Sequence, residues 1–236
     1  MTVLGGEKDA TNLDFMLKAI QMMRIGNEKR AEAGVDPTTG RELADLKVSV
    51  VMWAQAMAYA NMEAYTEYHW APDCNVSVIV PSGENLALGR IDHAYEGWYD
   101  EEKQLYDFVQ KYLADNPGKT EDDAKAAAKE AGIVSHSGYS YGHYTTLLNG
   151  DTATGFGYTT NGRRGAATQQ FGSNMYFYDD GVTGEARYAH LYTLDEMEKL
   201  LTNYKNSIDA KIAEAQDNLA KKQAELEALM AKKETT

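Results

Sequence analysis

The sequence predicts an α+β fold, a three-layer sandwich of helices around an antiparallel sheet, followed by a long C-terminal helix of coiled-coil type. Three observations lead to this prediction. Helical periodicity runs through residues 11–132, strand-like segments follow from residue 133, and residues 195–236 contain no glycine or proline. Helices first and antiparallel strands later, packed together, are typical of α+β domains. We therefore expect a globular domain over residues 1–193 and a stalk helix over residues 194–236.

Capping residues mark the first two helices. The first helix is expected to begin at Thr11 and to end before Gly34, because threonine caps helix N-termini and glycine ends helices. Ser49 is expected to cap a second helix that is rich in alanine and methionine and runs to about Tyr68. The apolar stretch inside it is too short to cross a bilayer and predicts a buried helix.

The middle of the chain predicts two more helices with irregular segments before them. Residues 76–80 alternate like a short strand, and the glutamate of residues 83–87 is read as part of a glycine-flanked loop. A third helix is expected over residues 98–113. Thr120 is followed by three acidic residues and opens a fourth helix that stops at Gly132, since acidic side chains favour a helix N-terminus.

The strands are expected in the last third of the globular domain. The dipeptides Asn161-Gly162 and Asp180-Gly181 are typical of turns between paired strands. The segments with strand composition are residues 144–148, 154–160, 166–171, 175–178 and 185–192.

The final segment predicts a long amphipathic helix. Its 9 acidic residues are interleaved with 7 basic ones, and its apolar residues recur at spacings of three, four or seven. A strict heptad is not kept, so supercoiling should be weak. One alternative is a terminal helix packed on its own domain. We favour the beginning of a stalk, because its last four turns are too polar to bury much alone. Self-association through this helix is a further expectation. The apolar positions are Leu201, Tyr204, Ile208, Ile212, Ala215, Leu219, Leu226 and Met230.

Composition limits the classes of function. The chain has 23 basic and 36 acidic residues, a formal net charge of −13. This balance argues against a nucleic-acid or anionic-membrane binder, because phosphate contacts need clustered lysine and arginine. A single cysteine, Cys74, permits no internal disulfide.

Three short clusters carry residue types that are suited to a ligand site. They are Gly83-Glu84-Asn85-Leu86-Ala87, Trp98-Tyr99-Asp100-Glu101-Glu102-Lys103 and Gly142-His143-Tyr144-Thr145. Each cluster alone also fits a structural role, as a capping carboxylate, a helix-dipole partner or a structural histidine. In this order they resemble the CAP superfamily, also called the SCP domain, over roughly residues 13–192. The lack of paired cysteines looks most like its Gram-positive bacterial branch. More loosely, the long helix expected after residue 193 is similar to the coiled-coil stalk on which surface-exclusion proteins carry a CAP-like domain.

The resemblance implies a cleft that is lined by two histidines and two glutamates. Carried over by motif, Glu84 and Glu101 match the glutamates, and His143 matches the second histidine. The candidate for the first histidine is His69, which lies fifteen residues before Glu84. His93 lies on the other side of the Gly-Glu-Asn-Leu motif and is left out of the set.

Such a set would hold a divalent cation, with zinc expected first and magnesium or calcium as alternatives. Neutral imidazole nitrogens are good zinc ligands, and two of them leave open coordination positions. Nearby carboxylates can hold a water or orient the imidazoles. The alternative is a polar network that only braces the fold.

We expect an extracellular, cell-wall-associated domain that is displayed on its helix and interacts with other surfaces. The more specific function expected of it is surface exclusion during conjugation. The alternative is a metal-dependent hydrolase or peptidase in which Glu84 or Glu101 acts as general base. The expected partner is a cell-surface protein, peptide, glycan or lipid. We expect a signal peptide and an anchor outside this segment, and no transmembrane segment or nucleic-acid partner within it.

Overall fold

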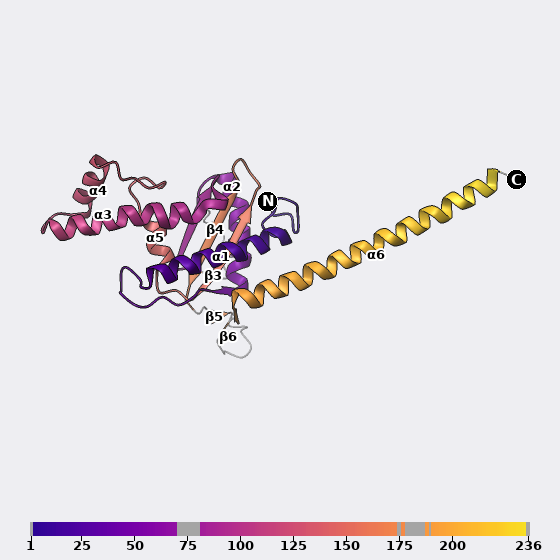
Figure 1. Ribbon diagram of the computed structural model, residues 1–236, viewed down its shortest axis with the longest axis horizontal. Helices are drawn as coiled ribbons and strands as arrows, with labels where there is room; N and C mark the ends of the chain where they lie inside the picture. Colours follow the sequence, from indigo (N-terminus) through magenta and orange to yellow (C-terminus); the bar gives the residue numbers. More distant parts are fainter. Residues whose placement is uncertain (1, 70–80, 174–175, 178–186, 189, 235–236) are drawn as a thin grey trace. The chain divides into compact units, whose positions relative to one another are not determined.

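The computed structural model describes residues 2–69, 81–173, 176–177, 187–188 and 190–234 (Figure 1). These residues form a mixed α/β fold with a five-stranded sheet, and the chain divides into two compact units, Met1–Met197 and Glu198–Thr236. The predicted strand-like residues 76–80, Cys74 and the turn Asp180-Gly181 lie outside the described residues.

Six α-helices and seven strands make up the described part of the chain. The helices are α1 (Leu13–Ala33), α2 (Val50–Thr66), α3 (Glu102–Asp115), α4 (Glu121–Glu130), α5 (Gly142–Leu147) and α6 (Leu194–Glu234). A 3-10 turn, η1 (Ile91–His93), and a π-helical turn, η2 (Glu96–Glu101), precede α3. The strands are β1 (Lys47–Ser49), β2 (Gly83–Leu88), β3 (Ala153–Thr159), β4 (Ala166–Gly172), β5 (Tyr176–Phe177), β6 (Arg187–Tyr188) and β7 (Leu191–Tyr192).

The predicted helix caps are confirmed at most ends. Ser49 caps α2, and Thr120 caps α4 through a complete capping box. Gly34 ends α1 with a φ of 74°, a left-handed conformation that glycine adopts without strain. The N-cap of α1 is Asn12 rather than Thr11, because the Asn12 side chain is the one that accepts a backbone N–H of the first turn.

The large sheet is mixed, with the strand order β2-β4-β3-β1-β7. The antiparallel pair β3–β4 confirms the hairpin predicted around Asn161-Gly162. The prediction of an antiparallel sheet is wrong for one pair, since β1 runs parallel to β3 while pairing antiparallel with β7. β1 has only three residues, too few for the alternation by which a strand is recognised in a sequence.

Two segments differ in type from their predictions. Residues 83–87, expected in a loop, lie in β2, which pairs along its whole length with β4. The strand predicted over residues 144–148 is wrong, because this segment falls mostly in α5. Its tyrosine and threonines favour strands only weakly out of context. In the folded chain Tyr144, Leu147 and Leu148 are instead buried.

Two glycines of β3 allow α2 to approach the sheet closely. A Cβ at Gly155 would lie 2.3 Å from the backbone nitrogen of Trp53, and one at Gly157 would lie 2.2 Å from the Ala56 carbonyl oxygen. Both distances are far below van der Waals contact, so the backbone of α2 rests directly on β3. This contact fixes the position of α2, and therefore of the residues that follow its C-terminal end.

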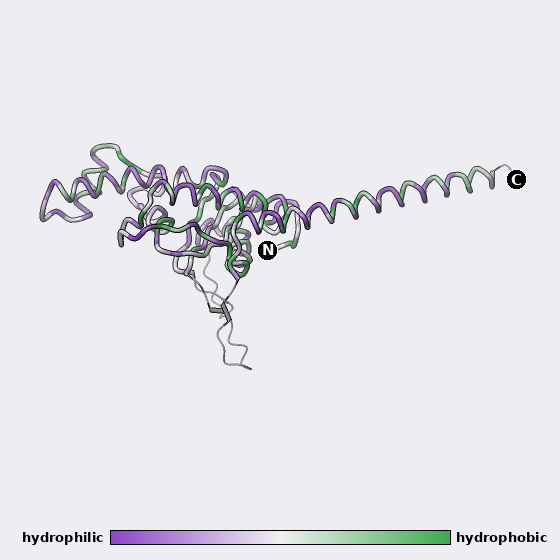
Figure 2. Tube along the Cα trace, turned by 60° about the horizontal axis from the view of Figure 1, so that its bottom comes forward, coloured by the Kyte–Doolittle hydropathy of each residue, from purple (hydrophilic) through white to green (hydrophobic). Residues whose placement is uncertain are grey.

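The long helix α6 begins where the sequence predicts and is amphipathic, with alternating hydrophilic and hydrophobic residues along its length (Figure 2). Thr193 and Glu196 form a capping box at its N-terminus, with the Thr193 hydroxyl accepting from the Glu196 N–H at 3.2 Å and the Glu196 carboxylate accepting from the Thr193 N–H at 2.8 Å. These bonds lower the pKa of Glu196. None of the described helices combines the length and apolar character that a bilayer span requires.

The close approach of α2 to β3 predicts the effect of adding one methyl group. Gly157→Ala should lower the free energy of unfolding by about 1–3 kcal/mol, because the new Cβ would overlap backbone atoms that cannot move without shifting α2. Urea unfolding followed by circular dichroism measures the change. The matched control is Gly150→Ala, since a Cβ at Gly150 meets nothing within 4 Å. Equal stability of the two variants would contradict the packing described.

Candidate functional site

A cleft of about 310 Å³ lies along the outer edge of β2, the strand at one end of the sheet among the described residues. Three consecutive residues of this strand line it: Leu86, Ala87 and Leu88. Successive side chains of a strand point to opposite faces of a sheet, so three in a row can share a cleft only along the strand's edge. Four of the chain's five histidines also line it, namely His69, His93, His136 and His143.

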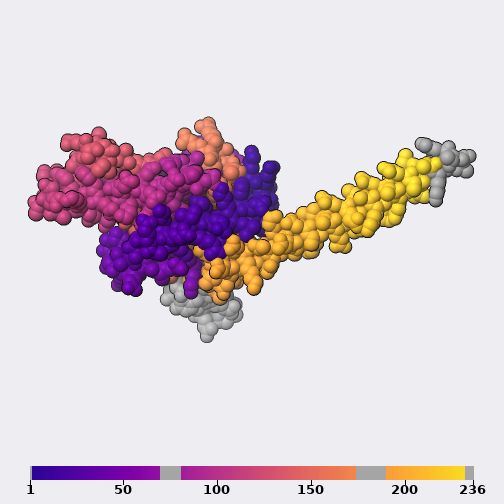
Figure 3. All heavy atoms as spheres, in the orientation of Figure 1, coloured from indigo at the N-terminus to yellow at the C-terminus, as the bar shows by residue number. Residues whose placement is uncertain are grey.

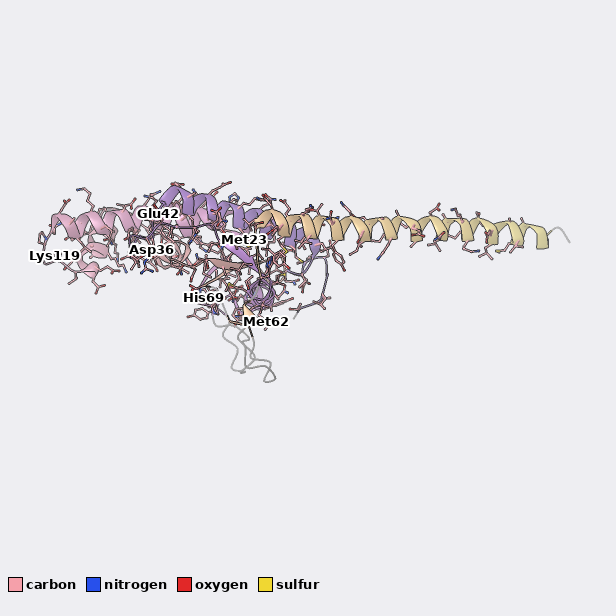
Figure 4. The ribbon with its side chains drawn as sticks, turned by 90° about the horizontal axis from the view of Figure 1, so that it is seen from below. Met23, Asp36, Glu42, Met62, His69 and Lys119 are labelled. Carbon is pink, nitrogen blue, oxygen red and sulfur yellow. The ribbon has the colours of Figure 1, made fainter. Side chains whose placement is uncertain are left out.

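His69, which is labelled in Figure 4, follows the C-terminal end of α2 in the sequence and lines the cleft. The C-cap of this helix is Glu67, whose φ of 55° is the only positive value for a non-glycine residue in the described chain. His69 Nδ1 lies 2.8 Å from Glu84 Oε1, and the other oxygen of Glu84 accepts from Gln170 Nε2 at 2.8 Å. The Glu84 hydrogen bond raises the pKa of His69 above its ordinary value.

His143, in the first turn of α5, is held by a different carboxylate. Its Nδ1 lies 2.7 Å from Glu102 Oε1, which also accepts the Ser137 hydroxyl at 2.8 Å. The second oxygen of Glu102 accepts the backbone N–H of Tyr144 at 3.0 Å. Glu102 is fully buried, and these three donors supply the hydrogen bonds that a buried carboxylate needs.

The π-helical turn η2 decides which glutamate meets His143. A π turn holds one more residue than an α turn, so it displaces every later side chain by about one position. Glu102 therefore contacts His143, whereas the predicted Glu101 accepts from Arg90 Nη1 at 2.9 Å and from the backbone N–H of His136 at 2.7 Å. Sequence reasoning missed Glu102, because a motif match counts residues without knowing where a wide turn occurs.

The arrangement leaves imidazole nitrogens available to a ligand. His69 and His143 each use Nδ1 in a hydrogen bond to a carboxylate, and His93 does the same with Glu96 at 2.7 Å. Within the described part of the chain, no protein atom is hydrogen-bonded to Nε2 of these three rings. A carboxylate at Nδ1 fixes the ring and the tautomer, so that Nε2 presents a lone pair, as in histidines that bind metal ions.

The four predicted ligands do not form one tight cluster in the described chain. The group whose ligand atoms all lie within 4.8 Å of one another contains His69 and Glu84 together with Glu63, a fully buried residue of α2. Glu63 also accepts the hydroxyl of Thr168. His143 lines the same cleft as His69, while Glu101 points toward Arg90. This tight group offers a cation one imidazole nitrogen and the oxygens of one buried and one half-buried carboxylate, and His143 adds a second imidazole to the lining of the cleft.

No family model matches this sequence, and no curated protein matches it either.

The burial of Glu102 predicts a large difference between two neighbouring substitutions. Glu102→Gln should lower the free energy of unfolding by about 2 kcal/mol, because an amide nitrogen cannot accept from the donors that now converge on the carboxylate. Glu101→Gln, the matched control, should lower it by less than about 1 kcal/mol, since that ion pair is only partly buried and water can reach it. Chemical denaturation measures both, and a larger loss in Glu101→Gln would refute the assignment.

The His69–Glu84 pair predicts a shifted histidine titration. In metal-free protein, NMR should find the pKa of His69 above about 6.5, and Glu84→Gln should bring it down. Because the folded pKa is raised, the stability contributed by this pair is complete below pH 6.5 and is lost as the pH rises through the raised pKa. Identical His69 titration curves in the two proteins would show that Glu84 does not act on this ring.

Proposed function

We propose that this chain is an extracellular, CAP-like surface domain whose cleft binds a divalent cation, displayed on a helical stalk for surface interaction. The observation that carries the proposal is a pair of imidazoles, His69 and His143, each fixed at Nδ1 by a carboxylate and both lining one cleft. The surface location and the role in surface exclusion rest on the sequence resemblance alone.

The packing around β3 supports the helix–sheet–helix layering of the proposed family. Gly155 and Gly157 face α2, and the residues between and after them face the other way because side chains alternate along a strand. On that side the ring of Phe156 contacts Trp98, with centroids 6.1 Å apart, and the ring of Tyr158 contacts Phe15 of α1. Figure 3 shows atoms of α1 and of α3 on the same face of the globular unit.

The hydrogen bonds favour the imidazoles over the carboxylates as direct ligands. Both oxygens of Glu84 already accept protein donors, and so do both oxygens of Glu102. The Nε2 atoms of His69 and His143 have no such partner among the described residues. Nitrogen ligands with open coordination positions suit zinc better than magnesium or calcium, which prefer oxygen. Glu84 and Glu102 would then orient the ligands without binding the ion.

The same hydrogen bonds favour binding over hydrolysis. A general base must reach the proton that it removes. Glu84 accepts from His69 and Gln170, and Glu101 accepts from Arg90 and the His136 backbone. Both candidate bases of the alternative function, a metal-dependent peptidase, are therefore already engaged by protein donors. We infer that the cleft holds a ligand rather than cleaving one.

The stalk supports the display and self-association part of the proposal. α6 has 41 residues, which at 1.5 Å per residue extend about 60 Å. Ile212, Leu219 and Leu226 are each at least half exposed and repeat every seven residues, the spacing at which one helix packs along another. An exposed apolar seam of this kind is suited to a second copy of the same helix.

Calorimetry tests the cation site. Zinc should bind the wild-type chain with a measurable heat, and His143→Ala should weaken this binding by at least about tenfold because one of two nitrogen ligands is lost. Magnesium and calcium should give much smaller heats.

The matched control is His190→Ala, which removes an exposed histidine outside the cleft lining and should leave zinc binding unchanged. Equal zinc heats in the wild type and His143→Ala would end the proposal. Metal-dependent cleavage of casein that a chelator abolishes would favour the peptidase.

A further inference from the structure

The residues that line the cleft have the opposite charge character to the rest of the chain. The chain carries a net charge of −13, yet the lining contains two arginines, Arg90 and Arg164, four histidines and no aspartate or glutamate. The two arginines bring fixed positive charge and N–H donors to this surface, which is what binding an anion requires.

The carboxylates next to the cleft are turned toward protein donors. Arg90 Nη1 and Nη2 bind Glu101 and Glu96, each at 2.9 Å, so the charge of Arg90 is already balanced. Arg164 differs from it. Among the described residues, no hydrogen bond or ion pair engages its guanidinium group. Arg164 is therefore the cation in the lining that is free to bind an outside partner.

The β3–β4 loop places the side chain of Arg164 beside Gly89. The carbons of this side chain pass 3.6 Å from the position that a Cβ of Gly89 would occupy. Gly89 follows the C-terminal end of β2, whereas the His69–Glu84 pair lies near its start. The five residue steps from Glu84 to Gly89 span about 16 Å of extended strand. Between these two ends the wall is formed by half-buried residues 86–88.

We infer that the ligand of this cleft carries an oxyanion, a carboxylate or a phosphate ester, which Arg164 binds, and a short apolar part that lies along residues 86–88 toward the histidines. A guanidinium group offers paired N–H donors that match the oxygens of either anion. A volume of about 310 Å³ holds a small molecule or the end of a longer chain. The inference rests on the proposed function in that both use the same cleft.

Four six-carbon probes separate charge from apolar contact: hexyl phosphate, hexanoate, hexanol and hexylammonium. NMR shift titration gives their dissociation constants for the wild type, Arg164→Gln and Arg163→Gln, after metal removal on a chelating resin and again with one equivalent of zinc. Arg163 is the matched control, because it is the adjacent exposed arginine and lines a different pocket, beside Lys8 and Tyr65.

Both anions should bind the wild type at least about tenfold more tightly than hexanol or hexylammonium, with shifts at residues 86–88. Arg164→Gln should weaken the anions about fivefold or more, and Arg163→Gln should not change them. The probe with the lower dissociation constant indicates whether the natural ligand carries a phosphate ester or a carboxylate. Equal binding by the wild type and Arg164→Gln, or no preference for anions, would overturn the inference.

The two metal conditions separate this inference from the proposed function. If zinc does not bind while the anions still depend on Arg164, the oxyanion inference stands and the cation site fails. If zinc binds in the cleft while the probes show no dependence on Arg164, the cation site stands and the oxyanion inference fails.

Discussion

The buried carboxylate of Glu102 is the constraint on which the rest of the site depends. Water cannot reach it, so protein donors must satisfy both of its oxygens. These donors come from the segment before α5 and from the first turn of α5, through Ser137, His143 and the backbone of Tyr144. One side chain at the start of α3 thus fixes the orientation of α5 and of the imidazole that α5 carries.

Arg30 holds the other end of the same helix. It is almost completely buried in α1, and its guanidinium group donates to the carbonyl oxygens of Ala44, Leu147, Asn149 and Asp151. Leu147 is the last residue of α5, and Asp151 precedes β3. A helix of six residues has little stability of its own. The two buried charged side chains, one at each end, explain why these residues form a helix although their composition weakly favours a strand.

The sequence predicts the helices better than the sheet. It also predicts that a glutamate pairs with His143, but not which of two neighbouring glutamates does so. Caps such as Ser49 and Thr120 act within one turn, so their effect is visible locally. The three residues of β1 become a strand only because β3 and β7 lie on either side, which no local pattern reveals. The exchange of Glu101 for Glu102 beside His143 has a similar cause, since the π turn before α3 has no recognisable sequence signal.

The central claim is that imidazoles from two distant segments, oriented by buried or half-buried carboxylates, hold one cation at the edge of β2. Anomalous X-ray scattering at the zinc absorption edge, from crystals of the zinc-loaded chain, tests it most directly. The account predicts a single strong peak about 2.0–2.1 Å from Nε2 of both His69 and His143. A peak bound instead by Glu63 and Glu84 without His143, or no peak in the cleft, would contradict it.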